Sequence, residues 1–191
     1  MECDREIVEE CNRGRDGDYK IRVNNPPTPY MGDFANAKIL LLQLNPGSEI
    51  YPGLNPAEDV EFKIFKNLKQ DIFKSLRGEK MKFPFYWLNP EYILTGGFRY
   101  WARIFSSVIE KKEDYYKIAN RVCCIQYFPY HSRRYYPIPI RIIRKYRGRS
   151  EKFLESQKYG FSLVRRFLEK STPQRVVRLS PIKKRRSRSV S

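Results

Sequence analysis

Two short polar motifs each follow an apolar run, and both carry groups that could bind or activate a ligand. Asn45-Pro46-Gly47-Ser48 comes directly after KILLLQL at residues 38–44, and Pro129-Tyr130-His131-Ser132 comes after RVCCIQYF at residues 121–128. An amide such as that of Asn45 can hold a water molecule or donate to a ligand carbonyl. Proline and glycine would then fix a tight loop with backbone amides facing the ligand. An ordinary strand-ending turn is the alternative interpretation.

Gln126 and His131 are the other polar candidates. Gln126 lies inside an apolar run, so its amide needs hydrogen-bond partners from the protein or from a ligand. A satisfied core amide is the alternative. His131 is the single histidine of the chain, and it either contacts a ligand or serves as a hydrogen-bonded loop residue.

The four cysteines do not predict a metal centre. Cys3, Cys11, Cys123 and Cys124 lack the C-x2-C pairs of a zinc site and the spacing of an iron–sulfur site. Strand alternation would place the thiols of Cys123 and Cys124 on opposite faces of a sheet. We expect reduced, buried thiols, with no metal and no cofactor.

Hydrophobic periodicity predicts the elements that position these motifs. Unbroken apolar runs predict strands at 38–44, 121–128 and 175–179, and a period near 3.6 predicts helices at 57–77, 98–111 and 151–169. Residues 3–13 have a weaker helical pattern. The proline loop at 24–29 leads into a turn at 30–33. This order predicts an α/β fold of three layers, a short parallel sheet with helices on both faces. Both polar motifs then lie at the carboxyl ends of strands, where such sheets bind ligands.

Charge points to a polyanionic partner. The chain has 38 Lys and Arg against 21 Asp and Glu, a net charge of +17. Phosphate backbones are the commonest polyanion, so we expect DNA, with RNA as the alternative. A membrane is not expected, because no apolar run approaches the ~20 residues of a span. The charged first fifteen residues do not have the pattern of a signal peptide, which predicts a cytoplasmic protein. We expect a monomer.

The sequence predicts one domain over residues 1–180 and a basic disordered tail over 181–191. The tail, PIKKRRSRSVS, has no core pattern. It could contact nucleic acid or act as a nuclear import signal. The abrupt change of composition instead favours non-native coding at the end of a truncated gene.

Several of these residues carry a resemblance to a known family. The segments Pro27-x-Pro29-Tyr30-x-Gly32 and AKILLLQLNPG at 37–47 resemble the opening of the uracil-DNA glycosylase superfamily. The branch that they resemble has Asn rather than Asp in its first motif, as do the single-strand-selective and mismatch-specific enzymes. Trp101 and the segment CIQYFP at 124–129 fit the same pattern, and the likeness spans roughly residues 25–170.

The resemblance implies an enzyme of DNA repair. Members have a four-stranded parallel sheet, flip a damaged base out of the duplex and hydrolyse its N-glycosidic bond. Carried over by position, Asn45 would hold the water and Gln126 would read the base edge. The base would also meet Gly47 and stack on Tyr51 or Tyr30. Residues expected to touch the nucleic-acid backbone are Ser48, His131, Ser132, Arg133 and Arg134.

The chain departs from the family at two points. Gln126 stands where the uracil enzymes have Asn, and no fourth parallel strand with a His-Pro-Ser-type loop follows Leu179. We therefore expect the sheet to lack its last strand. A catalytically degenerate nucleic-acid-binding protein of the same fold is the alternative. A small-metabolite-binding α/β protein is a weaker one, because the chain has no G-x-G-x-x-G and no Walker-type loop.

Overall fold

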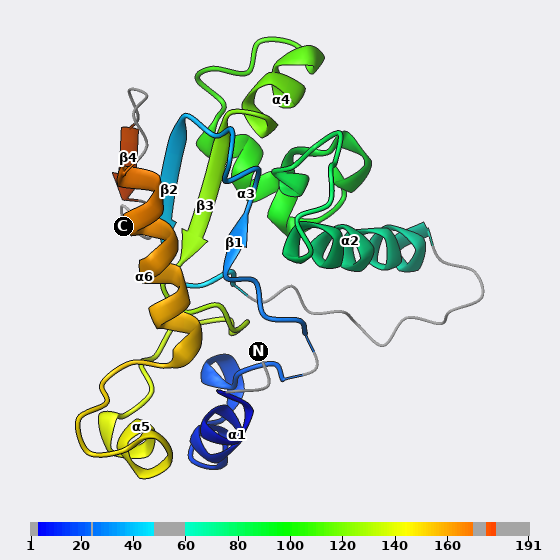
Figure 1. Cartoon of the computed structure of the whole chain (residues 1–191). Coiled ribbons are helices and arrows are strands. Elements are labelled where there is room, and N and C mark those ends of the chain that lie inside the picture. The colour runs from blue at the N-terminus through cyan, green and yellow to red at the C-terminus, as the bar shows by residue number, and fades with distance from the viewer. Residues whose placement is uncertain (1–3, 24, 48–59, 170–174, 179–191) are drawn as a thin grey trace, which may run out of the picture.

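A four-stranded sheet forms the centre of the protein (Figure 1). The computed structural model describes residues 4–23, 25–47, 60–169 and 175–178. The strands are β1 (Tyr30–Met31), β2 (Ile39–Gln43), β3 (Val122–Gln126) and β4 (Arg175–Arg178), in the order β1-β3-β2-β4. β2 runs parallel to both β3 and β4, so the three predicted strands form a parallel unit.

The sheet is mixed, because β1 pairs with β3 antiparallel. The prediction of a wholly parallel sheet is therefore wrong at this edge, where the sequence indicated only a turn. The physical reason is the short connection between β1 and β2, which spans residues 32–38. A parallel arrangement would need a crossover of a dozen or more residues. A strand of two residues also carries too little pattern to be recognised from the sequence.

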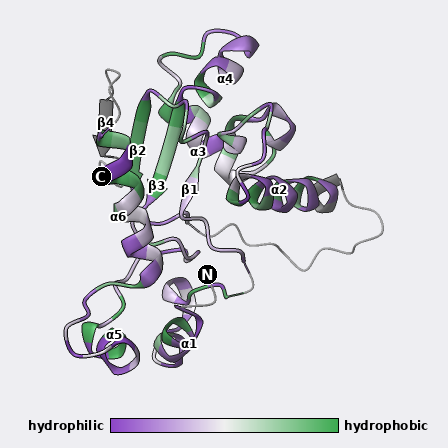
Figure 2. Ribbon diagram, viewed as in Figure 1, coloured by the Kyte–Doolittle hydropathy of each residue, from purple (hydrophilic) through white to green (hydrophobic). Residues whose placement is uncertain are grey.

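Helices cover both faces of the sheet (Figure 1). On one face lie α2 (Val60–Leu76), α3 (Gly96–Ile104) and α4 (Lys112–Ala119), and α6 (Glu155–Leu168) lies on the other. Alternation along β2 sends Leu41 toward the first group and Leu40 toward α6. β2 and β3 are accordingly hydrophobic along most of their length (Figure 2). Cys123 and Cys124 also face opposite cores, as predicted.

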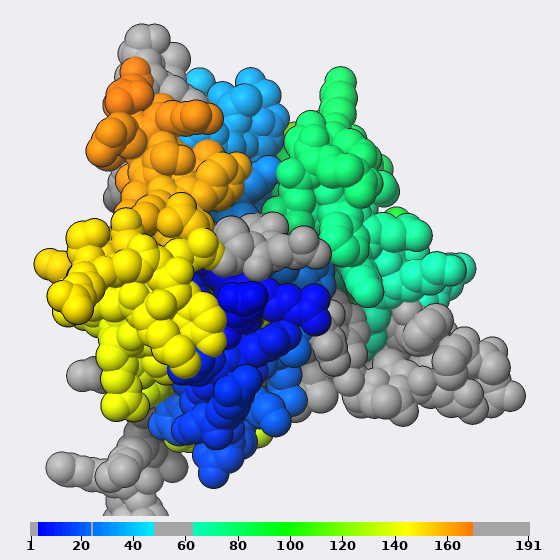
Figure 3. Space-filling view, turned by 60° about the horizontal axis from the view of Figure 1, so that its bottom comes forward, coloured from blue at the N-terminus to red at the C-terminus, as the bar shows by residue number. Residues whose placement is uncertain are grey.

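Two further helices lie beyond the carboxyl ends of the strands. They are α1 (Arg5–Arg13) and α5 (Ile140–Arg147), which pack side by side in Figure 3. Their apolar residues share a separate core with Phe128 and Tyr130, which follow β3. This unit covers the end of the sheet at which the two polar motifs lie.

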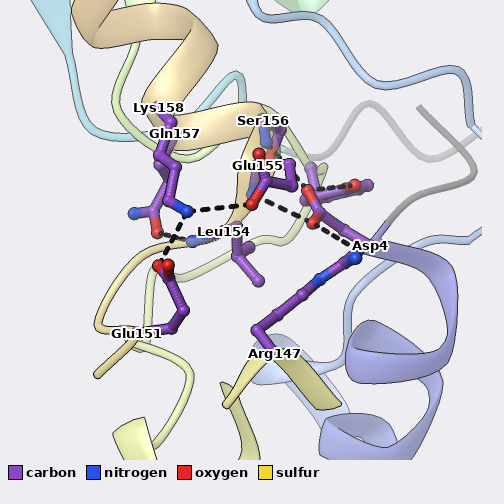
Figure 4. A network of polar contacts seen from close by, with 9 residues as sticks. Asp4, Arg147, Glu151, Leu154, Glu155, Ser156, Gln157 and Lys158 are labelled. Atoms are coloured by element: carbon purple, nitrogen blue, oxygen red, sulfur yellow. Dashed lines mark hydrogen bonds and ion pairs between the residues drawn. The ribbon is translucent and has the colours of Figure 1, made fainter. Parts of the chain in front are cut away.

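A buried carboxylate fastens this unit to the rest of the protein (Figure 4). Asp4 is fully buried, and its oxygens accept hydrogen bonds from the backbone amides of Glu155 and Ser156, each at 3.1 Å. The Tyr130 hydroxyl donates to Asp4 at 3.1 Å, and the Arg147 guanidinium lies at 3.6 Å. The carboxylate thus satisfies amide groups at the first turn of α6, where a negative charge is favoured.

Candidate functional site

Two glutamines lie side by side at the carboxyl ends of the central strands. Gln43 ends β2, Gln126 ends β3, and the two are register partners. Gln126 Nε2 donates to Gln43 Oε1 at 2.9 Å, and Gln43 Nε2 donates to the Tyr100 hydroxyl at 3.4 Å. The pair shares the face of the sheet on which Leu41 and Cys124 contact the helices. We call these two side chains the amide pair.

The amide pair has one unsatisfied atom. Gln126 is 1% exposed, and its Oε1 is buried without a hydrogen-bond partner. A buried acceptor left unpaired costs about 1–3 kcal/mol. The neighbouring Gln43 and Tyr100 are only half-buried, so the pair reaches the surface on that side. A ligand N–H that arrived there would satisfy Oε1 and remove the cost.

Asn45 lies at the same edge. The backbone continues the parallel pairing beyond the strands, since the amide of Tyr127 donates to the Gln43 carbonyl and that of Phe128 to the Leu44 carbonyl, each at 2.8 Å. Asn45 Nδ2 donates to the backbone carbonyl of Ser132 at 3.0 Å and approaches its hydroxyl at 3.3 Å. The two polar motifs predicted from sequence therefore meet. Because Nδ2 is held, the orientation of the Asn45 amide is fixed.

His131 holds loops together rather than facing outward. It is 7% exposed, its Nε2 lies 3.1 Å from the Thr28 hydroxyl, and its ring also hydrogen-bonds to the backbone of Pro26 and Gly47. Burial lowers the pKa of His131 to about 4, against the opposing effect of those backbone hydrogen bonds. The imidazole is neutral at pH 7 and has no charge to offer a phosphate. Gly47 adopts a φ of 74°, a conformation that suits glycine.

The remaining predicted site residues are scattered. Tyr30 pairs in register with Ile125, so its ring faces the α6 side of the sheet, and its hydroxyl donates to the Ser75 carbonyl at 2.8 Å. Arg133 and Arg134 are exposed and share one carboxylate, that of Asp18, at 3.2 and 3.3 Å. Ser132 is buried and bound to Asn45. Ser48 and Tyr51 lie outside the described residues.

Sequence reasoning missed two members of this edge, Gln43 and Tyr100. Gln43 could have been found, because it is a polar residue at the end of an unbroken apolar run, as Gln126 is. Tyr100 could not, because a tyrosine on the apolar side of a helix has no sequence feature that marks it as a hydrogen-bond partner.

No helix among the described residues is both long enough and apolar enough to cross a membrane. Within the same residues, no cluster of three or more His, Cys, Asp or Glu side chains could hold a metal ion. Comparison of the chain with protein-family models, with curated proteins and with solved structures gave no match.

Proposed function

We propose that this protein binds a nucleobase, extruded from DNA, at the carboxyl edge of β2 and β3 and hydrolyses its N-glycosidic bond. The observation that carries the proposal is the buried, unpartnered Oε1 of Gln126 in the amide pair. A nucleobase edge presents ring and exocyclic N–H groups, which are the donors that this oxygen needs. The half-buried Gln43 and Tyr100 border the approach to it.

The Asn45 amide would hold the attacking water in place. Its Nδ2 is held by Ser132, so its Oδ1 is the atom left to accept a hydrogen bond from the attacking water. Fixed dipoles of this kind stabilise the charge that develops on the leaving base and on the sugar, without needing to reorganise. The resemblance of this loop to the first motif of the uracil-DNA glycosylase superfamily supports the same role. The parallel strands β3, β2 and β4 are compatible with that fold.

The charge of the chain supports DNA as the substrate. A net charge of +17 attracts the phosphate backbone and raises the rate of encounter. The enzyme would act as a monomer, since an extruded base occupies one edge of one sheet. It would need no metal, because the water is activated by position and by amide dipoles.

The proposal is tested by base release from oligonucleotides that carry uracil, hypoxanthine or mismatched thymine. We expect wild-type protein to release one of these bases, and Asn45→Ala to lower the rate about 100-fold or more, because the water loses its acceptor. Asn36→Ala is the matched control, since Asn36 is exposed and bonds only within its own turn. Absence of release by wild-type protein on all three substrates would contradict the catalytic proposal.

A second candidate is a protein of the same fold that binds nucleic acid without chemistry. The burial of His131 and Ser132 favours it, because both are engaged within the protein. The groups described at this edge are amides, hydroxyls, a thiol and a neutral imidazole, and none is a carboxylate. Binding to the lesion-bearing oligonucleotides without base release, together with a steep fall in affinity as salt rises, would identify this function.

A further inference from the structure

An apolar pocket lies at the carboxyl ends of β2 and β3, and both members of the amide pair are among the residues that line it. It has a volume of about 500 Å³ and lies between the carboxyl ends of β2 and β3 and the helix α6. Its walls are mostly aliphatic and aromatic, and its polar lining residues are Gln157 and the amide pair. The apolar ones include Leu42, Leu44, Ile125, Tyr127, Phe161 and Val164. A flat, largely apolar group fits such walls.

Two exposed aromatic residues, Tyr127 and Phe161, line the pocket, and a third, Phe153, lies against Phe161 beside it. Tyr127 is 36% exposed, Phe153 38% and Phe161 40%. The ring centroids of Tyr127 and Phe161 are 6.0 Å apart, and those of Phe153 and Phe161 are 5.1 Å apart. We call these three residues the aromatic platform. A contiguous group of large rings left in water marks a binding surface more often than an isolated exposed ring does.

Positive charge predominates in the part of the chain that carries the aromatic platform. The segment from Tyr127 to Glu169 has eleven Lys and Arg but three Glu. Arg165 lies one helical turn beyond Phe161 on α6, and Lys152 precedes Phe153 in the chain. Both side chains are exposed, and neither is in an ion pair with another described residue. The occupant should therefore combine flat rings with negative charge.

We propose that the aromatic platform and its pocket bind the bases of a single-stranded segment of nucleic acid by stacking, while the nearby cations contact its phosphates. Base–aromatic stacking tolerates any sequence, because every base has a flat face. This inference rests on the proposed function in one respect only, namely that the partner is a nucleic acid. The amide pair and the pocket share the ends of β2 and β3, so the platform holds nucleotides that flank the extruded one.

The test is the affinity for an undamaged, fluorescently labelled thymidine oligonucleotide, measured by anisotropy over a range of salt concentrations. We expect Phe161→Ala and Tyr127→Ala each to weaken binding about tenfold, with the salt dependence unchanged, because stacking is lost and the charges remain. Phe161→Trp should retain the affinity. Phe73→Ala is the matched control, because Phe73 is a similarly exposed ring on α2.

Thermal unfolding of each variant establishes that it is folded. Unchanged affinity in folded Phe161→Ala and Tyr127→Ala would overturn the proposal that the aromatic platform binds bases. So would self-association of the wild-type protein that these substitutions abolish, because the surface would then bind a second copy of the chain. Platform-dependent binding without base release would overturn the catalytic proposal alone. Base release with platform-independent binding would overturn this inference alone.

Discussion

At the scale of single residues, burial decides what each polar side chain can do. The place of Gln126 and Asn45 at one edge of the sheet could be predicted from sequence, because each is a polar residue at the end of an apolar run and needs a partner or a ligand. The role of His131 could not, because Thr28, Pro26 and Gly47 surround it only in the fold. The same histidine that sequence reasoning placed against phosphates stays neutral and joins two loops.

The buried histidine makes stability depend on pH. The pKa of His131 is about 4 in the folded protein and near 6.5 when exposed, so the unfolded state takes up the proton first as pH falls. Unfolding free energy should therefore decrease from about pH 6.5 to about pH 4, by about 3 kcal/mol from this group. Urea unfolding across this range checks it. In His131→Gln the unfolding free energy should decrease less steeply as pH falls. An equally steep decrease would contradict the assignment of this pH dependence to His131.

At the scale of elements, length and amphipathicity determine what could be foreseen. β2, β3, α2 and α6 follow from long periodic or apolar runs. α5 was not predicted, because its segment is rich in Lys and Arg. Its buried residue Ile143 nevertheless faces the core. The predicted helix at 98–111 is shorter in the structure, where α3 ends at Ile104. Val108, which the apolar pattern assigned to its buried side, is exposed.

The junction of α1, α5 and α6 depends on Asp4. Asp4→Ala would leave two amides of α6, the Tyr130 hydroxyl and the Arg147 guanidinium without their acceptor. We expect a loss of about 3 kcal/mol in unfolding free energy, because the donors of a buried charged network would be left without their acceptor. Denaturant unfolding measures it. Asp16→Ala, at an exposed position whose side chain makes no capping bond, is the control, and an equal loss there would contradict the account.

At the scale of the whole molecule, the sequence specified an α/β protein whose polar motifs meet at one edge of the sheet. It could not specify the antiparallel β1 or the contact between Asp4 and the start of α6, because the latter joins residues 151 positions apart. The resulting arrangement brings the amide pair and the apolar pocket together at the carboxyl ends of β2 and β3.

The central claim is that the Gln126 amide binds a ligand rather than stabilising the core. It is tested most directly by the affinity of wild-type protein and Gln126→Met for a duplex with one mismatched uracil, thymine or hypoxanthine, relative to a fully paired duplex. Methionine preserves the volume, removes the unpaired oxygen, and leaves the half-buried Gln43 Oε1 to accept from solvent in place of Gln126 Nε2. We predict that the wild-type preference for the mismatched duplex falls about tenfold in Gln126→Met while its unfolding free energy is not lowered. An unchanged preference together with a destabilised fold would show that Gln126 is a structural amide.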